Sequence, residues 1–265
     1  MSKKNFDIYL DLGTSKIRAA GFEKNENNKI FSLENNCLTT LKSNQLNLSF
    51  TDKILEKTIL EIEKKTGEYL NNINLMLDCP GALSISLSVS KKNENFFLIR
   101  EDIEYLIQDA KQQILDAYQD KNIIHIIVNN YKINNIDHNS LPLNIKCNKF
   151  SIDIVFICFP SEIIDNLEKL FSKHQILIDN FICTSYAKSF TYQEHFTEFN
   201  QIAFLDIGYE KTSIVFYEQE KIKFFDVLPI GGHHITKDIS KILNLNIELS
   251  EKIKLNLNKD IIFSD

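Results

Sequence analysis

The sequence has no excess of positive charge. Its 265 residues contain 30 Lys and Arg against 36 Asp and Glu, so the formal net charge is -6. The nearest approach to a basic block is Lys3-Lys4, which is too short to indicate more than a solvated terminus. A protein that binds duplex nucleic acid needs a basic face for the phosphates. The composition therefore argues against a nucleic-acid partner.

Paired cysteines are also missing. The cysteines are scattered, never stand in a Cys-x-x-Cys spacing and mostly lie in apolar segments; they are Cys37, Cys79, Cys147, Cys158 and Cys183. This pattern predicts neither a zinc site nor disulfide bonds. We expect small buried side chains in a reducing compartment such as the cytosol.

Long apolar runs are absent too. No segment approaches the roughly 18 apolar residues that a membrane-spanning helix needs. The first residues, MSKKNFDIYLDLG, contain no apolar stretch of the kind found in signal peptides. We expect a cytoplasmic protein that reaches a membrane only peripherally, through a surface helix or a partner.

What the sequence does contain, near its start, is a strand, a tight turn and a second strand. Residues 6–12 and 16–22 are apolar and β-prone, and Gly13-Thr14-Ser15 joins them. Two strands joined so closely form a hairpin, whereas the glycine motifs of P-loop and Rossmann proteins lead into a helix. A third strand near residues 29–33 would complete a β-meander.

Helical and strand patterns alternate along the rest of the chain and indicate an α/β protein. We expect helices over residues 51–69, 100–118, 162–172, 184–196 and about 233–257, and strands over 72–78, 83–89, 122–128, 151–159, 175–183, 201–207, 212–217 and 221–228. Residues 134–140 are typical of a polar loop. Because residues 83–159 have β-α-β-β order with their own helix, they predict a compact inserted subdomain.

One pattern occurs twice, about 195 residues apart, as YLDLGTSKI and FLDIGYEKTSI. In the first copy Gly13 permits close approach of an anion, and Thr14 and Ser15 supply hydroxyl and amide donors. Lys16 would offset phosphate charge. Asp11, at the end of the strand, is placed to hold Mg²⁺ through water. Taken alone, this pattern is equally typical of a plain β-turn.

The second copy strengthens the phosphate interpretation. Asp206, Gly208 and Thr212 recreate the carboxylate, the glycine and a hydroxyl. Gly231 and Gly232 follow the third strand of this region and precede a helix, whose first N–H groups and dipole attract phosphate. Two such hairpins facing each other would hold a triphosphate and its metal from both sides.

These motifs together resemble the actin, Hsp70 and sugar-kinase superfamily and, within it, the FtsA family of bacterial cell division proteins. DLGTSKIRA resembles the first phosphate motif of that family, and PIGGHHITKDIS resembles its Pro-Ile-Gly-Gly-x-His-Ile-Thr-x-Asp-Ile stretch. Glu251 and Lys254 resemble a Glu-x-x-Lys pair that lies near the nucleoside in relatives. The resemblance runs from residue 7 to about 254.

The resemblance implies an α/β, actin-like (ribonuclease H-like) fold with duplicated domains, an inserted α+β subdomain and an incomplete second lobe. It divides the chain into a first lobe over residues 1–82 and 160–198, the insert over 83–159, and a partial second lobe over 199–265. Family members continue past this point to an amphipathic membrane-binding helix that is not visible in this chain.

The resemblance also implies a function. The cofactors would be ATP and Mg²⁺, with Asp11 and Asp206 holding the metal through water. The protein would be a scaffold that links the ring of the tubulin-like protein FtsZ to the inner membrane, self-associates and recruits other division proteins. It would act at the cytoplasmic face of the inner membrane at the division site.

Two departures from the family pattern bear on the nucleotide. The second phosphate motif of relatives usually reads Asp-Ile-Gly-Gly-Gly-Thr-Thr, whereas Tyr209 and Glu210 replace two glycines here. We expect Tyr209 to crowd the turn and Glu210 to repel phosphate, so that binding is weakened. Thr184-Ser185 replaces the family's Glu-Pro, which removes the residue expected to orient water. The chain would be at most a weak ATPase.

Two alternatives share the fold. One is a scaffold of a pilus or secretion platform, which the string IGGHHIT argues against. The other is a small-molecule kinase, which requires intact glycine-rich loops and a catalytic carboxylate. A metal site at His233-His234 beside Asp238 is disfavoured because adjacent helical side chains diverge. His125, in an apolar run, is expected to be a hydrogen-bonded interior residue.

Overall fold

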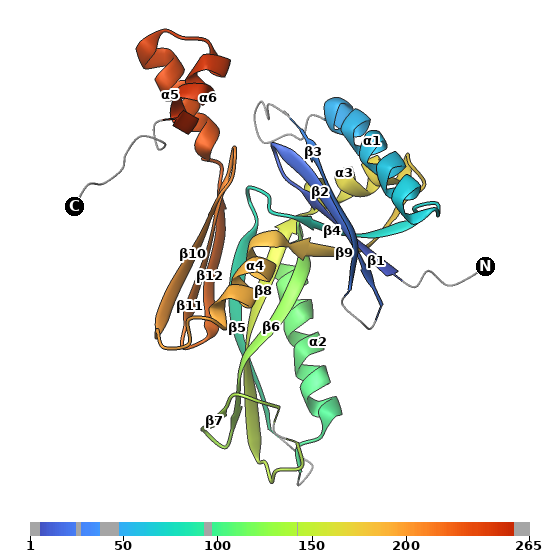
Figure 1. Cartoon of the computed structure of the whole chain (residues 1–265). Coiled ribbons are helices and arrows are strands. Elements are labelled where there is room, and N and C mark those ends of the chain that lie inside the picture. Colours follow the sequence, from blue (N-terminus) through green and yellow to red (C-terminus); the bar gives the residue numbers. More distant parts are fainter. Residues whose placement is uncertain (1–5, 25–27, 38–47, 93–96, 142, 257–265) are drawn as a thin grey trace.

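A computed structural model describes residues 6–24, 28–37, 48–92, 97–141 and 143–256. Figure 1 shows these residues as two sheets with helices beside them. The strands are β1 (Phe6–Leu12), β2 (Lys16–Glu23), β3 (Lys29–Asn36), β4 (Asn72–Leu77), β5 (Leu83–Lys92), β6 (Lys121–Ile133), β7 (Ile136–His138), β8 (Lys149–Pro160), β9 (Leu177–Cys183), β10 (Gln201–Ile207), β11 (Thr212–Glu218) and β12 (Lys221–Leu228). The helices are α1 (Leu48–Thr66), α2 (Arg100–Ala117), α3 (Ser161–Ser172), α4 (Thr184–Gln193), α5 (Gly232–Leu243) and α6 (Ile247–Asn256).

The first sheet has the order β3-β2-β1-β4-β9. The predicted meander β1–β3 is antiparallel, whereas β1, β4 and β9 run parallel. Asp11 pairs with Met76, and Leu77 pairs with Cys183. The carboxyl ends of three parallel strands therefore meet at one edge, which is where open α/β sheets bind ligands.

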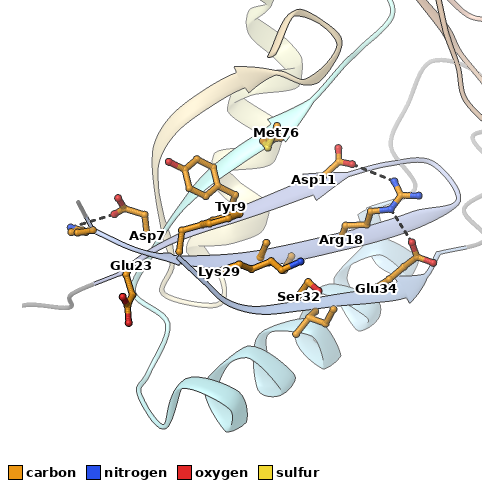
Figure 2. A pocket seen from close by; sticks show the side chains of 14 residues that line it. Asp7, Tyr9, Asp11, Arg18, Glu23, Lys29, Ser32, Glu34 and Met76 are labelled. Carbon is orange, nitrogen blue, oxygen red and sulfur yellow. Dashed lines mark hydrogen bonds and ion pairs between the residues drawn. The ribbon is translucent and has the colours of Figure 1, made fainter. Parts of the chain in front are cut away.

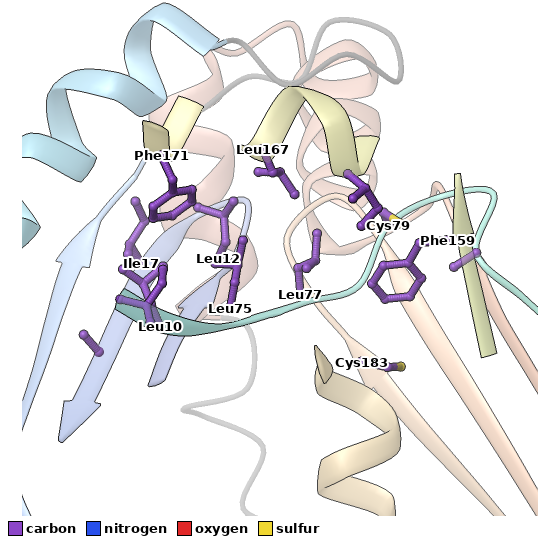
Figure 3. Close-up of a cluster of buried hydrophobic side chains, with 14 of the residues drawn as sticks. Leu10, Leu12, Ile17, Leu75, Leu77, Cys79, Phe159, Leu167, Phe171 and Cys183 are labelled. Carbon is purple, nitrogen blue, oxygen red and sulfur yellow. The ribbon is translucent and has the colours of Figure 1, made fainter. Parts of the chain in front are cut away.

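The alternating pattern of β1 places its core. Ile8, Leu10 and Leu12 are buried on one face, and side chains of α3 pack over them (Figure 3). Leu10 and Phe171 are fully buried in this cluster. Removing such a side chain from water is worth about 1.5–3 kcal/mol. This core holds the strand ends in place from beneath.

The second sheet joins two regions that the sequence treats separately. Its order is β10-β11-β12-β5-β8-β6-β7, so the meander β10–β12 continues into the strands of residues 83–159. The junction is short: Asp226 pairs with Leu83, and the Phe225 N–H donates to the Ser84 hydroxyl at 2.9 Å. Helix α2 packs on β5 and β6 and forms a second core with them.

The structure corrects three element boundaries. Helix α1 runs from Leu48 to Thr66, so it begins three residues before the predicted start at residue 51. The expected polar loop 134–140 contains a hairpin, because Asn134 and Asn135 adopt the positive φ values that a tight turn between β6 and β7 requires. The long helix expected over 233–257 is two helices, interrupted where Asn244 adopts a left-handed conformation.

Other expectations from composition are met in the described part of the chain. All five cysteines are free and buried, as the sequence predicted. Across the described residues we find no helix with the length and apolar character needed to cross a membrane.

Candidate functional site

The two predicted turns have the same backbone geometry. The Gly13 N–H donates to the Lys16 carbonyl at 3.0 Å, and the Gly208 N–H donates to the Lys211 carbonyl at 2.8 Å. In each hairpin the last strand pair lies just before the turn. The pairs are Leu12 with Ile17 and Ile207 with Thr212. The two copies of the sequence pattern therefore form hairpins that are closed by the same backbone hydrogen bond.

Both turns face one cavity of about 450 Å³. Nine of the predicted nucleotide residues line it, namely Asp11, Gly13, Thr14, Ser15, Lys16, Asp206, Gly208, Gly232 and Lys254. The lining also includes Arg18, Asp78, Thr184, Lys188, Lys211 and Ser213, which the sequence analysis did not assign to the site. The structure thus brings the two hairpins and the start of α5 to a common space.

Three predicted residues do not line this cavity. Thr212 donates its hydroxyl to the Ile230 carbonyl at 2.6 Å, so it braces the turn against the loop before α5. Gly231 is packed against the second turn, and a Cβ there would lie 2.6–2.7 Å from backbone atoms of Gly208, Tyr209 and Lys211. Glu251 lies behind the lining and is described below. Their roles are structural in this arrangement.

The start of α5 is closed by the second turn. The Gly232 N–H donates to the Gly208 carbonyl at 2.9 Å and the His233 N–H to the Tyr209 carbonyl at 2.7 Å. The Gly231 N–H donates to Nδ1 of His234 at 3.1 Å. The expectation that free N–H groups of this helix attract phosphate is therefore wrong, because the chain's own groups accept them.

Tyr209 and Glu210 behave differently from what the sequence suggested. The Tyr209 ring stacks on His233 with centroids 4.5 Å apart, although the residue still contributes to the lining. Burial raises the pKa of Tyr209, and the carboxylates of Glu251 and Glu210 raise it further. Glu210 is itself buried and does not line the cavity. Glu210 therefore does not contact the cavity directly, although its charge acts on Tyr209 in the lining.

Each strand-end carboxylate has a basic partner. Figure 2 shows Asp11 and Glu34 on either side of Arg18, at 3.4 and 2.8 Å. Asp11 also accepts a hydrogen bond from the Thr184 hydroxyl at 3.3 Å. In the second hairpin, Asp206 lies 2.6 Å from the ammonium group of Lys188 on α4. The Asp11–Arg18 pair borders a second groove of about 840 Å³ on the outer face of the first sheet.

Asp78 connects the two sheets. It follows β4, is 6% exposed, and accepts hydrogen bonds from the Ser213 hydroxyl at 2.9 Å and from the Ser185 N–H at 3.2 Å. The Ser185 hydroxyl donates to the same carboxylate, and Lys211 donates to the Asp78 carbonyl. Because Ser213 and Lys211 belong to the second hairpin, Asp78 ties that hairpin to the first sheet.

Lys254 extends the lining from α6. Its ammonium group donates to the Gly232 carbonyl at 3.0 Å, to the Thr236 hydroxyl at 2.8 Å and to Glu251 at 2.7 Å. Burial raises the pKa of Glu251, but the hydrogen bonds from Lys254 and Thr236 outweigh it and lower that pKa overall. The predicted Glu251–Lys254 pair therefore fixes α6 against the first turn of α5.

The donor set fits phosphate better than it fits Mg²⁺. Glycine turns and lysine ammonium groups suit an anion. Mg²⁺ needs oxygen ligands, yet the carboxylates of Asp11 and Asp206 already face Arg18 and Lys188. In the described residues no three His, Cys, Asp or Glu side chains are grouped as metal ligands. The arrangement does not fit a magnesium ion held by these two carboxylates.

Two histidines lie near this region without lining the cavity. His125 accepts a hydrogen bond from the Cys183 N–H at 2.9 Å, which confirms the interior role predicted for it, and burial lowers its pKa to about 4. His233 is 4% exposed, and its Nδ1 has no hydrogen-bond partner. Burial also lowers the pKa of His233, with Lys237 contributing.

Sequence reasoning missed Asp78 and Lys188. Asp78 could have been found, because it ends an apolar strand just as Asp11 does, and parallel strands bring such ends together. Lys188 carries no comparable signal, since it is one of many lysines on amphipathic helices. Only the packing of α4 between the hairpins brings it to Asp206.

Comparison with known proteins shows that the chain is similar to cell division protein FtsA, as its motifs indicated. The family described as cell division protein FtsA matches residues 203–261. The chain is 25% identical over 193 residues to FtsA of Helicobacter pylori, covering 71% of this chain and 39% of that protein. It is 23% identical over 268 residues to FtsA of Borreliella burgdorferi, covering 95% and 62%. The chain thus spans less than two thirds of the length of these relatives.

A solved structure supports the fold. The PilM–PilN type IV pilus biogenesis complex matches with a TM-score of 0.62 at 12% identity, over 96% of this chain and 70% of that chain. Together with the mixed first sheet, the antiparallel second sheet and the helices beside them, this confirms the predicted α/β fold of the actin-like class.

Proposed function

We propose that this divergent relative of FtsA is a nucleotide-binding scaffold of bacterial cell division. It would hold the phosphates of ATP between its two hairpins and link the ring of the tubulin-like protein FtsZ to the inner membrane. It would also recruit other division proteins and self-associate at the cytoplasmic face of the division site. The division role rests on the similarity to curated FtsA proteins.

One observation carries the nucleotide part of this proposal. Two hairpins with the same glycine hydrogen bond face a single cavity, whose lining contains more basic than acidic side chains. Glycine at each turn lets an anion approach the backbone closely. Thr14 and Ser15 place hydroxyl groups beside it. This is the chemistry that a phosphate chain requires.

The site is tested most sharply by a charge change that preserves shape. We expect Thr14→Glu to weaken binding of labelled ATP at least about tenfold relative to Thr14→Gln, because the two side chains differ mainly in charge and a carboxylate repels phosphate. Equal binding by the two variants would place the nucleotide elsewhere.

The inserted region offers a surface for a protein partner. Phe97, Ile99 and Ile145 are exposed, and the backbone bond from Leu98 to Ile145 brings them together at one end of the insert. Exposed apolar residues that cluster in this way mark interaction sites more often than isolated ones do. We propose this surface as the contact for a division protein.

Co-sedimentation with FtsZ polymers of the same organism tests the scaffold role. We expect the chain to pellet with the polymers and Ile99→Asp to reduce pelleting. Leu60→Asp is the matched control, because Leu60 is an exposed leucine on α1, away from the insert. Failure of the unmodified chain to bind either FtsZ or other division proteins contradicts the scaffold proposal.

The kinase and pilus alternatives gain no comparable support. The likeness to the pilus complex concerns the fold alone, whereas the sequence relatives above are division proteins. For the kinase alternative, Thr184 and Ser185 stand where relatives have Glu-Pro, and neither carries a carboxylate that could act as a base. Their hydroxyl groups donate to Asp11 and Asp78 instead.

A further inference from the structure

The two carboxylates that would hold a metal ion both face basic side chains. Asp206 lies 2.6 Å from Lys188, and Asp11 lies 3.4 Å from Arg18. The pairs are similar in kind although they come from different elements. Arg18 is on β2, within the first hairpin, whereas Lys188 reaches the second hairpin from α4. A positive charge therefore lies beside each of the two carboxylates to which the family resemblance assigns Mg²⁺.

The remaining charges of the lining give the cavity a positive balance. The basic side chains are Lys16, Arg18, Lys188, Lys211 and Lys254, and the acidic ones are Asp11, Asp78 and Asp206. Five basic groups against three acidic groups leave the lining residues with a net charge of +2, although Glu34 pairs with Lys16 and Arg18, and Glu251 with Lys254, from outside the lining. Asp78 is buried and saturated with hydrogen bonds from serine donors. Each of the three carboxylates in the lining therefore already has a basic or hydroxyl partner.

The basic side chains of the lining could neutralise a phosphate chain without a metal ion. Mg²⁺ ordinarily neutralises phosphates and is itself held by carboxylates. Here a divalent ion at Asp206 would meet the positive charge of Lys188 and be repelled by it. By contrast, Lys188 can turn from Asp206 to a phosphate oxygen at little cost, because an ion pair this exposed contributes little.

We propose that this site binds the phosphates of a nucleotide without a divalent cation, with Lys188 as the counter-ion in the position that a metal would take. The inference rests on the proposed nucleotide function and specifies its chemistry. Lys211, which donates to the Asp78 carbonyl, adds a second lysine to the same lining from the second turn.

The test is equilibrium binding of labelled ATP to the full chain, in buffer with Mg²⁺ and in buffer with a chelator. For the unmodified chain we expect affinities that agree within about threefold between the two buffers. For Lys188→Ala we expect affinity in chelator to fall about tenfold, whereas Mg²⁺ restores most of it, because Asp206 is then free to hold a metal. Lys188→Arg should behave as the unmodified chain does.

Lys132→Ala is the matched control. Lys132 is a similarly exposed lysine in an ion pair with Asp137, but it lies in the insert and does not line the cavity. Its binding should equal that of the unmodified chain in both buffers. Thermal unfolding of each variant checks that Lys188→Ala is folded, and Lys188→Gln replaces it if it is not.

The outcomes separate the two proposals. Binding of ATP by the unmodified chain only when Mg²⁺ is present overturns this inference and leaves the nucleotide function standing. Binding in neither buffer overturns the nucleotide function and this inference with it. Mg²⁺-independent binding that Lys188→Ala does not alter overturns the assignment to Lys188.

Discussion

The two hairpins are closed by the same backbone hydrogen bond, but their side chains contact different parts of the molecule. In the first, Lys16 and Arg18 are exposed and pair with Glu34 on the neighbouring strand. In the second, Lys211 donates to Asp78 at the end of β4 in the other sheet, and Tyr209 stacks on His233. The first turn is therefore supported by its own meander, whereas the second is supported by contacts with distant elements. Glycine and strand register determine the turn, but tertiary contacts determine how firmly it is held.

The largest expected effect comes from removing the support of the second hairpin. Asp78→Ala leaves Ser185 and Ser213 without their buried acceptor, and we expect a loss of about 3–5 kcal/mol in the free energy of unfolding. Urea denaturation measures it. Asp7→Ala, which removes an exposed partner of Lys24 on the first hairpin, should cost less than about 1 kcal/mol. Similar losses would mean that the hairpins are supported alike.

A smaller loss should follow from crowding the contact between the second turn and α5. A Cβ on Gly231 would lie within 2.7 Å of three backbone atoms, so we expect Gly231→Ala to cost about 2–3 kcal/mol. At the adjacent Gly232 the nearest atom is the Lys254 ammonium at 3.6 Å, and alanine there should change stability by less than about 0.5 kcal/mol. Thermal unfolding of the two variants decides this. Equal stabilities would show that the turn can move away from α5.

The two turn glycines offer the most direct comparison. A Cβ on Gly13 would lie 2.7 Å from the Lys16 carbonyl, whereas on Gly208 it would lie 3.1 Å from the Lys211 carbonyl. We therefore expect Gly13→Ala to cost about 1–2 kcal/mol and Gly208→Ala less than about 1 kcal/mol. The midpoint of urea denaturation measures both. The reverse order would contradict the distances.

The smallest effect is a pH dependence of the free energy of unfolding, caused by His233 on α5, whose ring stacks on Tyr209 of the second turn. Burial lowers the pKa of His233 below the value near 6.5 that it has when unfolded. At pH values between the lowered pKa and 6.5 the unfolded chain binds more protons than the folded chain does. The free energy of unfolding should therefore fall as the pH drops below about 6.5. His233→Phe keeps a ring against Tyr209 but cannot titrate, and it should flatten part of this fall.

A second histidine must be allowed for in that measurement. Burial lowers the pKa of His125 to about 4, so this residue also makes the protein less stable as the pH falls below about 6.5. It does so equally in the unmodified chain and in His233→Phe, and the difference between their pH profiles therefore reports His233. Parallel pH profiles of the free energy of unfolding would contradict a role for His233.

Much of the first hairpin was predictable because its interactions are local. Strands alternate between core and surface, and Gly13 and Gly208 lie at turns that the apolar runs delimit. Local patterns could not reveal that Glu210 is buried outside the lining of the cavity or that turn carbonyls close the start of α5. Both depend on the position of α5 against the second turn.

The sequence by itself determined the strand–turn–strand units, the repeat of Asp11 and Asp206, and the relationship to FtsA, because these depend on short-range pattern and composition. The tertiary structure alone decided that Lys188 pairs with Asp206 and that Asp78 joins the two sheets. It also decided that residues 83–159 share a sheet with β10–β12. The reason is physical: side chains and strand edges from distant segments meet only after the cores are packed, and no local pattern specifies which of them will be neighbours.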